Sequence, residues 1–195
     1  NGETETGLTS FFLKKTVDTG DIIYQEKTPI LPEENFDELY FRMSQMAGPV
    51  IDKTLEIISV PDFKPRKQEE GLVTPAPKLK PEDCLIDWGF PSRHVVNFIR
   101  GLSSMPGAYS TFRGRKLKIF RARDIKLETP DRFRPGQIIN DKNRLLIATA
   151  DGAVEILELL PEGKTRISGS EFRRGYRPDS NDILGLRTDE ENSKK

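Results

Sequence analysis

A proline-rich stretch from residue 61 to residue 80 divides this chain of 195 residues into two parts. Its prolines stand at positions 61, 65, 75 and 77, and few of its other residues could build a core. Proline favours extended backbone, so the stretch can set a spacing between two folded parts. We predict a partial domain over 1–60, a linker over 61–80, a second domain over 81–177 and a disordered tail over 178–195.

Charge is distributed unevenly along a chain whose formal net charge is zero. The net formal charge is −4 over residues 1–80, +6 over residues 81–177 and −2 over residues 178–195. Long-range attraction depends on the local field and not on whole-chain neutrality. The cationic second domain therefore indicates a polyanionic partner.

The first part contains two β-prone runs followed by one long helical pattern. Residues 8–13 and 21–25 predict a hairpin-like pair of strands across a polar turn. Apolar residues then recur at intervals of three and four from Asn35 to Ile58, which predicts an amphipathic helix. Its start is a capping box, and Pro49 predicts a kink or a break near Ala47.

The second part changes from one helix to several short strands. Pro91 opens a helix that ends near Gly101. Strands are predicted over 109–113, 116–122, 137–139, 145–150 and 154–160, followed by a short closing helix over 170–176. The Asp151-Gly152 pair between two apolar runs is a strong hairpin signal. Several short strands with one helix suit a small, partly open barrel of the oligonucleotide-binding (OB) type.

Three segments resemble the methionyl-tRNA formyltransferase family. They are ETGLTSFFLKKTVDTGDIIYQ (5–25), IDWGFPSRHVVNFIRGLSSMPGAYSTFRGRKLK (86–118) and LLPEGKTRISGSEFRRGY (159–176). The second carries the family's IDW, IR and PGAY motifs and leads into GRKLKI, and the resemblance covers nearly everything before Pro178. It implies an α/β plus β fold: the C-terminal part of a Rossmann-like formyltransferase domain, followed by an OB-like small β-barrel domain.

The resemblance implies an enzyme of translation initiation. Members transfer a formyl group from the co-substrate 10-formyltetrahydrofolate to the methionyl amino group of initiator methionyl-tRNA, without a metal. The family's Asn-x-His and Ser-Leu-Leu-Pro motifs do not occur in this sequence, whose one histidine is His94. We therefore expect a fragment that is inactive alone. The alternatives are a formyltransferase acting on a sugar-nucleotide amine, and a stand-alone RNA-binding module.

Bulk properties suggest where such a protein works. No apolar run approaches the roughly 18 residues needed to cross a bilayer. The single cysteine, Cys84, cannot form an internal disulfide, which favours a reducing compartment. We expect a cytoplasmic monomer without membrane association, with an organellar matrix as the alternative location.

Asp18 is the candidate catalytic residue. The resemblance places it on a loop against the folate, where a buried carboxylate would orient an imidazole while the attacking amine loses a proton. The same resemblance assigns folate contacts to Thr16, Val17 and Asp18. In isolation, an Asp-Thr-Gly sequence such as this one is usually an ordinary turn between strands.

The segment from Arg113 to Lys126 is the candidate RNA-binding surface. It carries seven cations against a single carboxylate, that of Asp124, and apolar residues are interspersed among them. One face could pack while the other follows a phosphate backbone, although a solvated strand face is the competing interpretation. With the resemblance, the predicted tRNA-binding residues are Lys78, Lys80, Arg113, Arg115, Lys116, Lys118, Arg121, Arg123, Lys164 and Arg166.

Three other residues have side chains capable of chemistry but are expected to be structural. His94 lacks a local partner and is expected at the surface. Cys84 adjoins no basic cluster, so it is expected to be structural. Trp88 could stack on a base, but packing at the start of the helix is the simpler interpretation.

Overall fold

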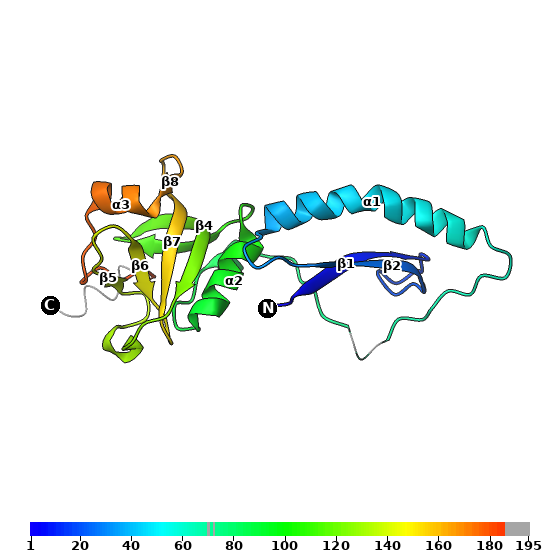
Figure 1. Cartoon of the computed structure of the whole chain (residues 1–195), viewed down its shortest axis with the longest axis horizontal. Coiled ribbons are helices and arrows are strands. Elements are labelled where there is room, and N and C mark those ends of the chain that lie inside the picture. Colours follow the sequence, from blue (N-terminus) through cyan, green and yellow to red (C-terminus); the bar gives the residue numbers. More distant parts are fainter. Residues whose placement is uncertain (70, 72, 186–195) are drawn as a thin grey trace. The chain divides into compact units, whose positions relative to one another are not determined.

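The computed structural model describes residues 1–69, 71 and 73–185, which form two compact units (Figure 1). The N-terminal unit is Glu3–Lys78, and the C-terminal unit begins at Leu79. The division therefore falls near the carboxyl end of the predicted linker. Within the described residues, no helix combines the length and apolarity that a membrane crossing would require.

The N-terminal unit is a two-stranded antiparallel hairpin with one long helix against it (Figure 1). Strands β1 (Glu5–Phe11) and β2 (Ile22–Pro29) confirm the predicted pair, and helix α1 (Phe36–Ile58) packs on both. Arg42 of α1 donates to the Glu34 carboxylate at 2.8 Å and to the Pro29 carbonyl at 2.6 Å. These bonds fix the helix to the end of β2.

Helix α1 begins at the predicted capping box but does not break where expected. The Glu38 amide donates to the Asn35 side chain and the Asn35 amide to the Glu38 carboxylate, each at 3.0 Å. The helix continues through Pro49, so the prediction of a break near Ala47 is wrong. Proline crowds the Cβ atom of the preceding residue, and that residue is Gly48, which has none.

The C-terminal unit is a curled antiparallel sheet of six strands with two helices. The strands are β3 (Ala108–Phe112), β4 (Arg115–Ile125), β5 (Ile138–Ile139), β6 (Leu145–Ala148), β7 (Ala153–Pro161) and β8 (Ile167–Ser168). Their order is β3-β4-β7-β6-β5, and β8 pairs with β7. The five predicted strands are confirmed, and the two-residue β8 was not predicted. Short 3-10 helices lie at Pro81–Cys84 and Pro130–Arg132.

Helix α2 (Ser92–Leu102) supplies one side of the core. Its Val95, Val96 and Ile99 are buried in the same cluster as Ile119 of β4 and Leu159 of β7. The Asp151-Gly152 turn between β6 and β7 reaches this helix as well, since the Ser92 amide donates to the Asp151 carboxylate at 2.7 Å. The hairpin turn thereby caps the helix.

Trp88 belongs to the same core. It is 4% exposed, and its indole N–H donates to the buried hydroxyl of Ser110 at 3.1 Å. Packing, and not base stacking, is therefore its role. Phe90 is partly exposed and stacks on His94, with ring centroids 4.5 Å apart.

Residues 178–185 follow helix α3 (Gly169–Tyr176) and are ordered. They lie against both edge strands of the sheet: Ile138 donates to the Asp182 carbonyl (3.0 Å), Leu184 to Gly136 (2.8 Å) and Gly185 to Thr111 (3.1 Å). Leu184 is 3% exposed, within the main core. The prediction of disorder is wrong here, because one buried leucine and backbone pairing order a segment of polar composition. Residues 186–195 of the predicted tail lie outside the described residues.

Candidate functional site

The loop between β1 and β2 carries the predicted catalytic residue. The Phe12 amide donates to the Asp21 carbonyl at 3.0 Å, and the Lys14 ammonium pairs with the Asp21 carboxylate at 2.9 Å, so the loop closes at its base. A Cβ atom on Gly20 would lie 1.6 Å from the Phe12 carbonyl oxygen. Glycine is therefore required at this point for the two sides of the loop to approach.

Asp18 lies at the tip of this loop in a left-handed conformation, with φ of 56°. Gln68 of the segment after α1 donates its side-chain amide to the carbonyl oxygens of Asp18 (2.9 Å) and Gly20 (2.8 Å). The backbone of the loop is thus held from outside. The Asp18 residue itself is exposed, whereas the expected chemistry calls for a buried carboxylate.

The neighbouring loop residues Thr16 and Val17 lie at the surface. The Thr16 carbonyl accepts from the Thr19 hydroxyl at 3.0 Å, and Val17 is 81% exposed. His94 lies in the other unit.

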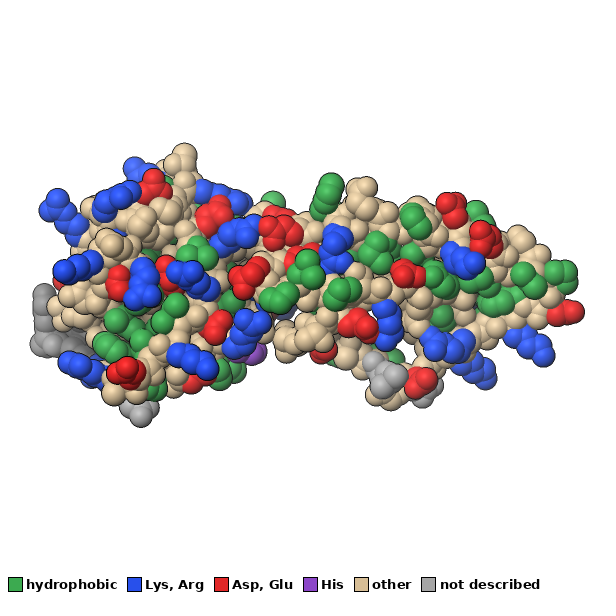
Figure 2. All heavy atoms as spheres, in the orientation of Figure 1, with side chains coloured by type: hydrophobic (Ala, Val, Ile, Leu, Met, Phe, Trp, Pro, Cys, Tyr) green, Lys and Arg blue, Asp and Glu red, His purple; other side chains and the backbone are tan. Residues whose placement is uncertain are grey.

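Three of the predicted cations lie against two carboxylates of strand β7. On β4, Arg123 pairs with Glu155 of β7 at 2.8 Å, and Arg121 lies 3.9 Å from Glu158. Arg166 pairs with the same Glu158 at 3.1 Å. Opposite charges facing each other on adjacent strands stabilise the sheet, and Figure 2 shows the two kinds of charge interleaved over this unit. At Arg121 and Arg123 the structure shows a solvated strand face, which is the competing interpretation.

Three more of the predicted RNA-binding cations also contact protein groups. Lys118 donates to the Pro106 carbonyl at 2.8 Å, and the Lys116 ammonium lies 3.9 Å from the centre of the Tyr109 ring. Arg113 binds Asp182 through two hydrogen bonds of 2.8 Å.

The Arg113–Asp182 pair perturbs both groups. The hydrogen bond with Asp182 raises the pKa of Arg113. Burial acts to raise the pKa of Asp182, but hydrogen bonds from Arg113 and from the Asp179 amide outweigh it and lower that pKa. The pair is therefore ionised at neutral pH.

Arg115 and Lys164 differ from the six predicted cations described above. Both are exposed, and within the described parts of the chain neither side chain has a hydrogen-bond or carboxylate partner. They line the same cavity, together with the aromatic rings of Phe112, Phe172 and Tyr176. Lys78 and Lys80 are exposed at the end of the predicted linker.

The sequence analysis did not predict the carboxylate partners of these cations or the aromatic rings that line the cavity. Glu155 and Glu158 are distant in sequence from β4, and a count of charge along one strand does not include them. The spacing of Phe172 and Tyr176 could have predicted their contact, because residues four positions apart lie on one face of a helix.

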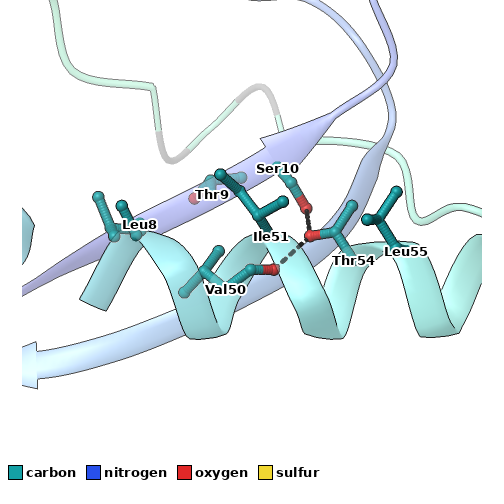
Figure 3. A pocket seen from close by; sticks show the side chains of 8 residues that line it. Leu8, Thr9, Ser10, Val50, Ile51, Thr54 and Leu55 are labelled. Carbon is teal, nitrogen blue, oxygen red and sulfur yellow. Dashed lines mark hydrogen bonds between the residues drawn. The ribbon is translucent and has the colours of Figure 1, made fainter. Parts of the chain in front are cut away.

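The N-terminal unit has a separate, apolar groove between β1 and α1 (Figure 3). Its volume is about 270 Å³, and Leu8, Val50, Ile51 and Leu55 line it. The Thr54 hydroxyl donates within it, to the Ser10 hydroxyl at 2.8 Å or to the Val50 carbonyl at 2.7 Å. Ile51 and Leu55 are more than half exposed, so the groove is an uncovered apolar surface.

Two family models match the chain. The model described as "Formyl transferase, C-terminal domain" matches residues 78–177, and the model "Formyl transferase" matches residues 1–55. The first accounts for the curled sheet with α2 and α3, and the second for the hairpin with most of α1.

Curated relatives match along most of the chain. It is 38% identical over 185 residues to the methionyl-tRNA formyltransferase of Solibacter usitatus, covering 95% of this chain and 58% of the relative. It is 40% identical over 179 residues to that of Chlorobium chlorochromatii, covering 90% and 56%. The chain thus spans somewhat over half the length of the curated relatives it matches.

Solved structures share the fold at low sequence identity. HypX from Aquifex aeolicus, in complex with tetrahydrofolic acid, is 24% identical with a TM-score of 0.64, covering 89% of this chain and 31% of that one. The sugar 3N-formyl transferase WlaRD gives 20% and 0.59, covering 84% and 57%. The methionyl-tRNA formyltransferase from Clostridium thermocellum gives 23% and 0.51, covering 80% and 58%.

Proposed function

The chain belongs to the formyl transferase family, and from that premise we propose that it is part of a methionyl-tRNA formyltransferase. In this proposal the whole enzyme transfers a formyl group from 10-formyltetrahydrofolate to the amino group of methionine on initiator tRNA, in the cytoplasm. The observation that carries the proposal is the match to relatives of that name, at 38–40% identity over at least 90% of this chain. The match runs through both units, so it includes the Asp18 loop and the cationic sheet together.

The N-terminal unit would contribute one edge of the formyl-transfer site. Bound 10-formyltetrahydrofolate would supply the formyl group, and the backbone of Thr16, Val17 and Asp18 would hold its ring. The carboxylate of Asp18 would orient an imidazole that accepts the proton lost by the amine. Neither the Asn-x-His nor the Ser-Leu-Leu-Pro motif occurs in this chain, so its 195 residues alone should transfer no formyl group.

The C-terminal unit would bind the tRNA backbone. Support comes from the net charge of +6 over residues 81–177 and from the unpaired cations Arg115 and Lys164. When protein cations bind phosphates, they release the counterions condensed on the nucleic acid, and this release favours binding. Cations already paired with carboxylates contribute less to it. Among the predicted contacts we therefore rank Arg115, Lys164, Lys78 and Lys80 first, Lys116 and Lys118 next, and the carboxylate-paired Arg113, Arg121, Arg123 and Arg166 last.

A titration of the chain with fluorescently labelled initiator tRNA at several potassium chloride concentrations tests this proposal. We expect binding whose affinity falls steeply with salt, and a weaker salt dependence for Arg115→Gln/Lys164→Gln. A matched double variant, Lys126→Gln/Lys142→Gln, removes the same charge from exposed positions outside the cavity and should change the salt dependence less. No affinity at low ionic strength, or affinity insensitive to salt, would contradict RNA binding.

A sugar-nucleotide amine is the competing substrate class, since a sugar formyltransferase shares the fold. A sugar nucleotide carries few charges, so its binding should depend on salt far less than that of tRNA. Titration of the same chain with a 3-amino-sugar nucleotide, in parallel with tRNA, distinguishes the two classes. Tighter binding of the sugar nucleotide would favour that alternative.

A further inference from the structure

We propose that the cavity between the β3–β4 turn, the loop after β7 and helix α3 binds one nucleotide of an RNA strand, with the base against Tyr176 and the phosphate between Arg115 and Lys164. This inference rests on the proposed RNA-binding function of the C-terminal unit and assigns it a specific subsite. All lining residues belong to that unit.

The size of the cavity favours one ring with its phosphate over a whole cofactor. Its volume is about 220 Å³. Pockets for complete small molecules usually measure roughly 300–1,000 Å³. A larger ligand would have to extend out of the cavity, as a strand of RNA does on either side of a single inserted nucleotide.

Aromatic side chains form one wall. The Phe172 and Tyr176 rings are stacked, with centroids 4.4 Å apart and an interplanar angle of 16°, and Phe112 meets the Phe172 ring edge to face at 5.1 Å. Phe112 and Phe172 are buried, whereas Tyr176 is only half-buried. Phe172 covers one face of the Tyr176 ring and Phe112 contacts it at 6.3 Å and 82°, while Tyr176 also lines the cavity, where a ligand ring can pack against it. Unpaired bases bind proteins by stacking on such faces, whatever their sequence.

Cations also line the cavity, at the start of β4 and on the loop after β7, and these two segments are bonded to each other. The Glu162 amide donates to the Lys116 carbonyl at 3.0 Å, and the Lys164 amide closes its own turn on the Pro161 carbonyl at 3.1 Å. The first bond joins the start of β4, which carries Arg115, to the loop that carries Lys164. Four cations line the cavity against the single carboxylate of Glu162: Arg113, Arg115, Lys116 and Lys164. Even with Arg113 paired to Asp182, positive charge is in excess.

The combination selects a nucleotide over simpler ligands. Inorganic phosphate would use only the cations, and an aromatic side chain of a protein partner would use only the ring. A nucleotide uses both, since its phosphate forms charge-assisted hydrogen bonds while its base stacks.

An NMR titration of the intact ¹⁵N-labelled chain tests the subsite, with adenosine monophosphate, adenosine and ribose 5-phosphate as separate ligands at low ionic strength. We expect adenosine monophosphate to shift the amides of Gly163 and Gly175, and the other two ligands to bind about tenfold more weakly. Arg115→Gln/Lys164→Gln and Tyr176→Leu should each weaken adenosine monophosphate by about tenfold. Tyr176→Phe, which keeps the ring, should bind like the unaltered chain.

The controls separate this inference from the function on which it rests. Lys126→Gln/Lys142→Gln should leave adenosine monophosphate binding unchanged. Equal binding of ribose 5-phosphate and adenosine monophosphate, or unchanged binding by Arg115→Gln/Lys164→Gln, would overturn the nucleotide subsite. If either of these results appeared while tRNA still bound with a steep salt dependence, RNA binding by the C-terminal unit would stand without the nucleotide subsite. A chain that bound no tRNA would overturn the proposed function and the inference together.

Discussion

The guanidinium of Arg113 lies along the carboxylate of Asp182, with Nε donating to Oδ1 and Nη2 to Oδ2, each at 2.8 Å. Arg113 is on the turn between β3 and β4, and Asp182 is on the segment after α3. The pair therefore connects an edge of the sheet to a segment whose polar composition predicts a disordered tail. It also occupies Arg113, which the sequence analysis predicts to bind RNA.

Removal of residues 178–185 is expected to destabilise the C-terminal unit. A chain stopped after Arg177 loses the buried Leu184 and the backbone bonds to Gly136 and Thr111. We expect the free energy of unfolding to fall by about 3 kcal/mol or more. Urea denaturation followed by the fluorescence of Trp88, the single tryptophan, measures it. A chain stopped after Gly185 is the control, and equal midpoints for the two truncations would refute a structural role for this segment.

Substitution of Asp182 by Asn should cost stability in a pH-dependent way. The folded-state pKa of Asp182 lies below its unfolded value, which is about 3.9 for an aspartate. Its contribution is therefore complete above the unfolded pKa and is lost as the pH falls through the folded one. At pH 7 we expect a loss of about 1 kcal/mol, a modest value because Arg113 is half exposed and water screens the pair.

Denaturation of both chains between pH 7 and pH 2 tests this expectation. The difference in unfolding free energy should shrink toward zero at the acid end. Glu128→Gln, at an exposed position, is the matched control and should show no comparable difference. A penalty for Asp182→Asn that stays constant with pH would mean that the ion pair contributes nothing.

Substitution of Glu158 by Gln should strengthen tRNA binding. Glu158 pairs with Arg166 and lies near Arg121. Without the charge of Glu158, both arginine side chains would be available to bind phosphates. We expect the slope of the logarithm of affinity against the logarithm of salt concentration to steepen by about 1. Fluorescence anisotropy with labelled tRNA at several salt concentrations measures the slope. Glu128→Gln changes the net charge equally, and an identical effect from both variants would show that only net charge matters.

Substitution of Gly20 by Ala should disrupt the Asp18 loop. The added Cβ atom would collide with the Phe12 carbonyl oxygen, and relief of that contact would break the closure between Phe12 and Asp21. Trypsin cleaves after Lys14 and Lys15 in this loop, and we expect cleavage there to accelerate about fivefold or more. Gly71→Ala, whose new Cβ atom would meet nothing within 4 Å, is the control. Equal cleavage rates in both variants would show that the loop tolerates the side chain.

Local features of this fold were readable from the sequence. The capping box at Asn35 and Glu38, the hairpin turn at Asp151 and Gly152, and the strand positions of the second unit depend on residues a few positions apart. Short-range sterics and hydrogen bonding determine such features, so the pattern of residue types predicts them. Even the error at Pro49 had a local cause, in the glycine that precedes it.

Sequence by itself therefore determined the family and most of the elements, and it predicted the site residues. Tertiary structure alone decided which cations are paired with carboxylates and which remain unpaired, and that Asp18 is exposed. It also decided that residues 178–185 complete the core. Pairing and burial depend on contacts between segments far apart in the chain, such as Arg123 with Glu155 and Arg113 with Asp182. No local pattern records those contacts, because they exist only once the strands have come together.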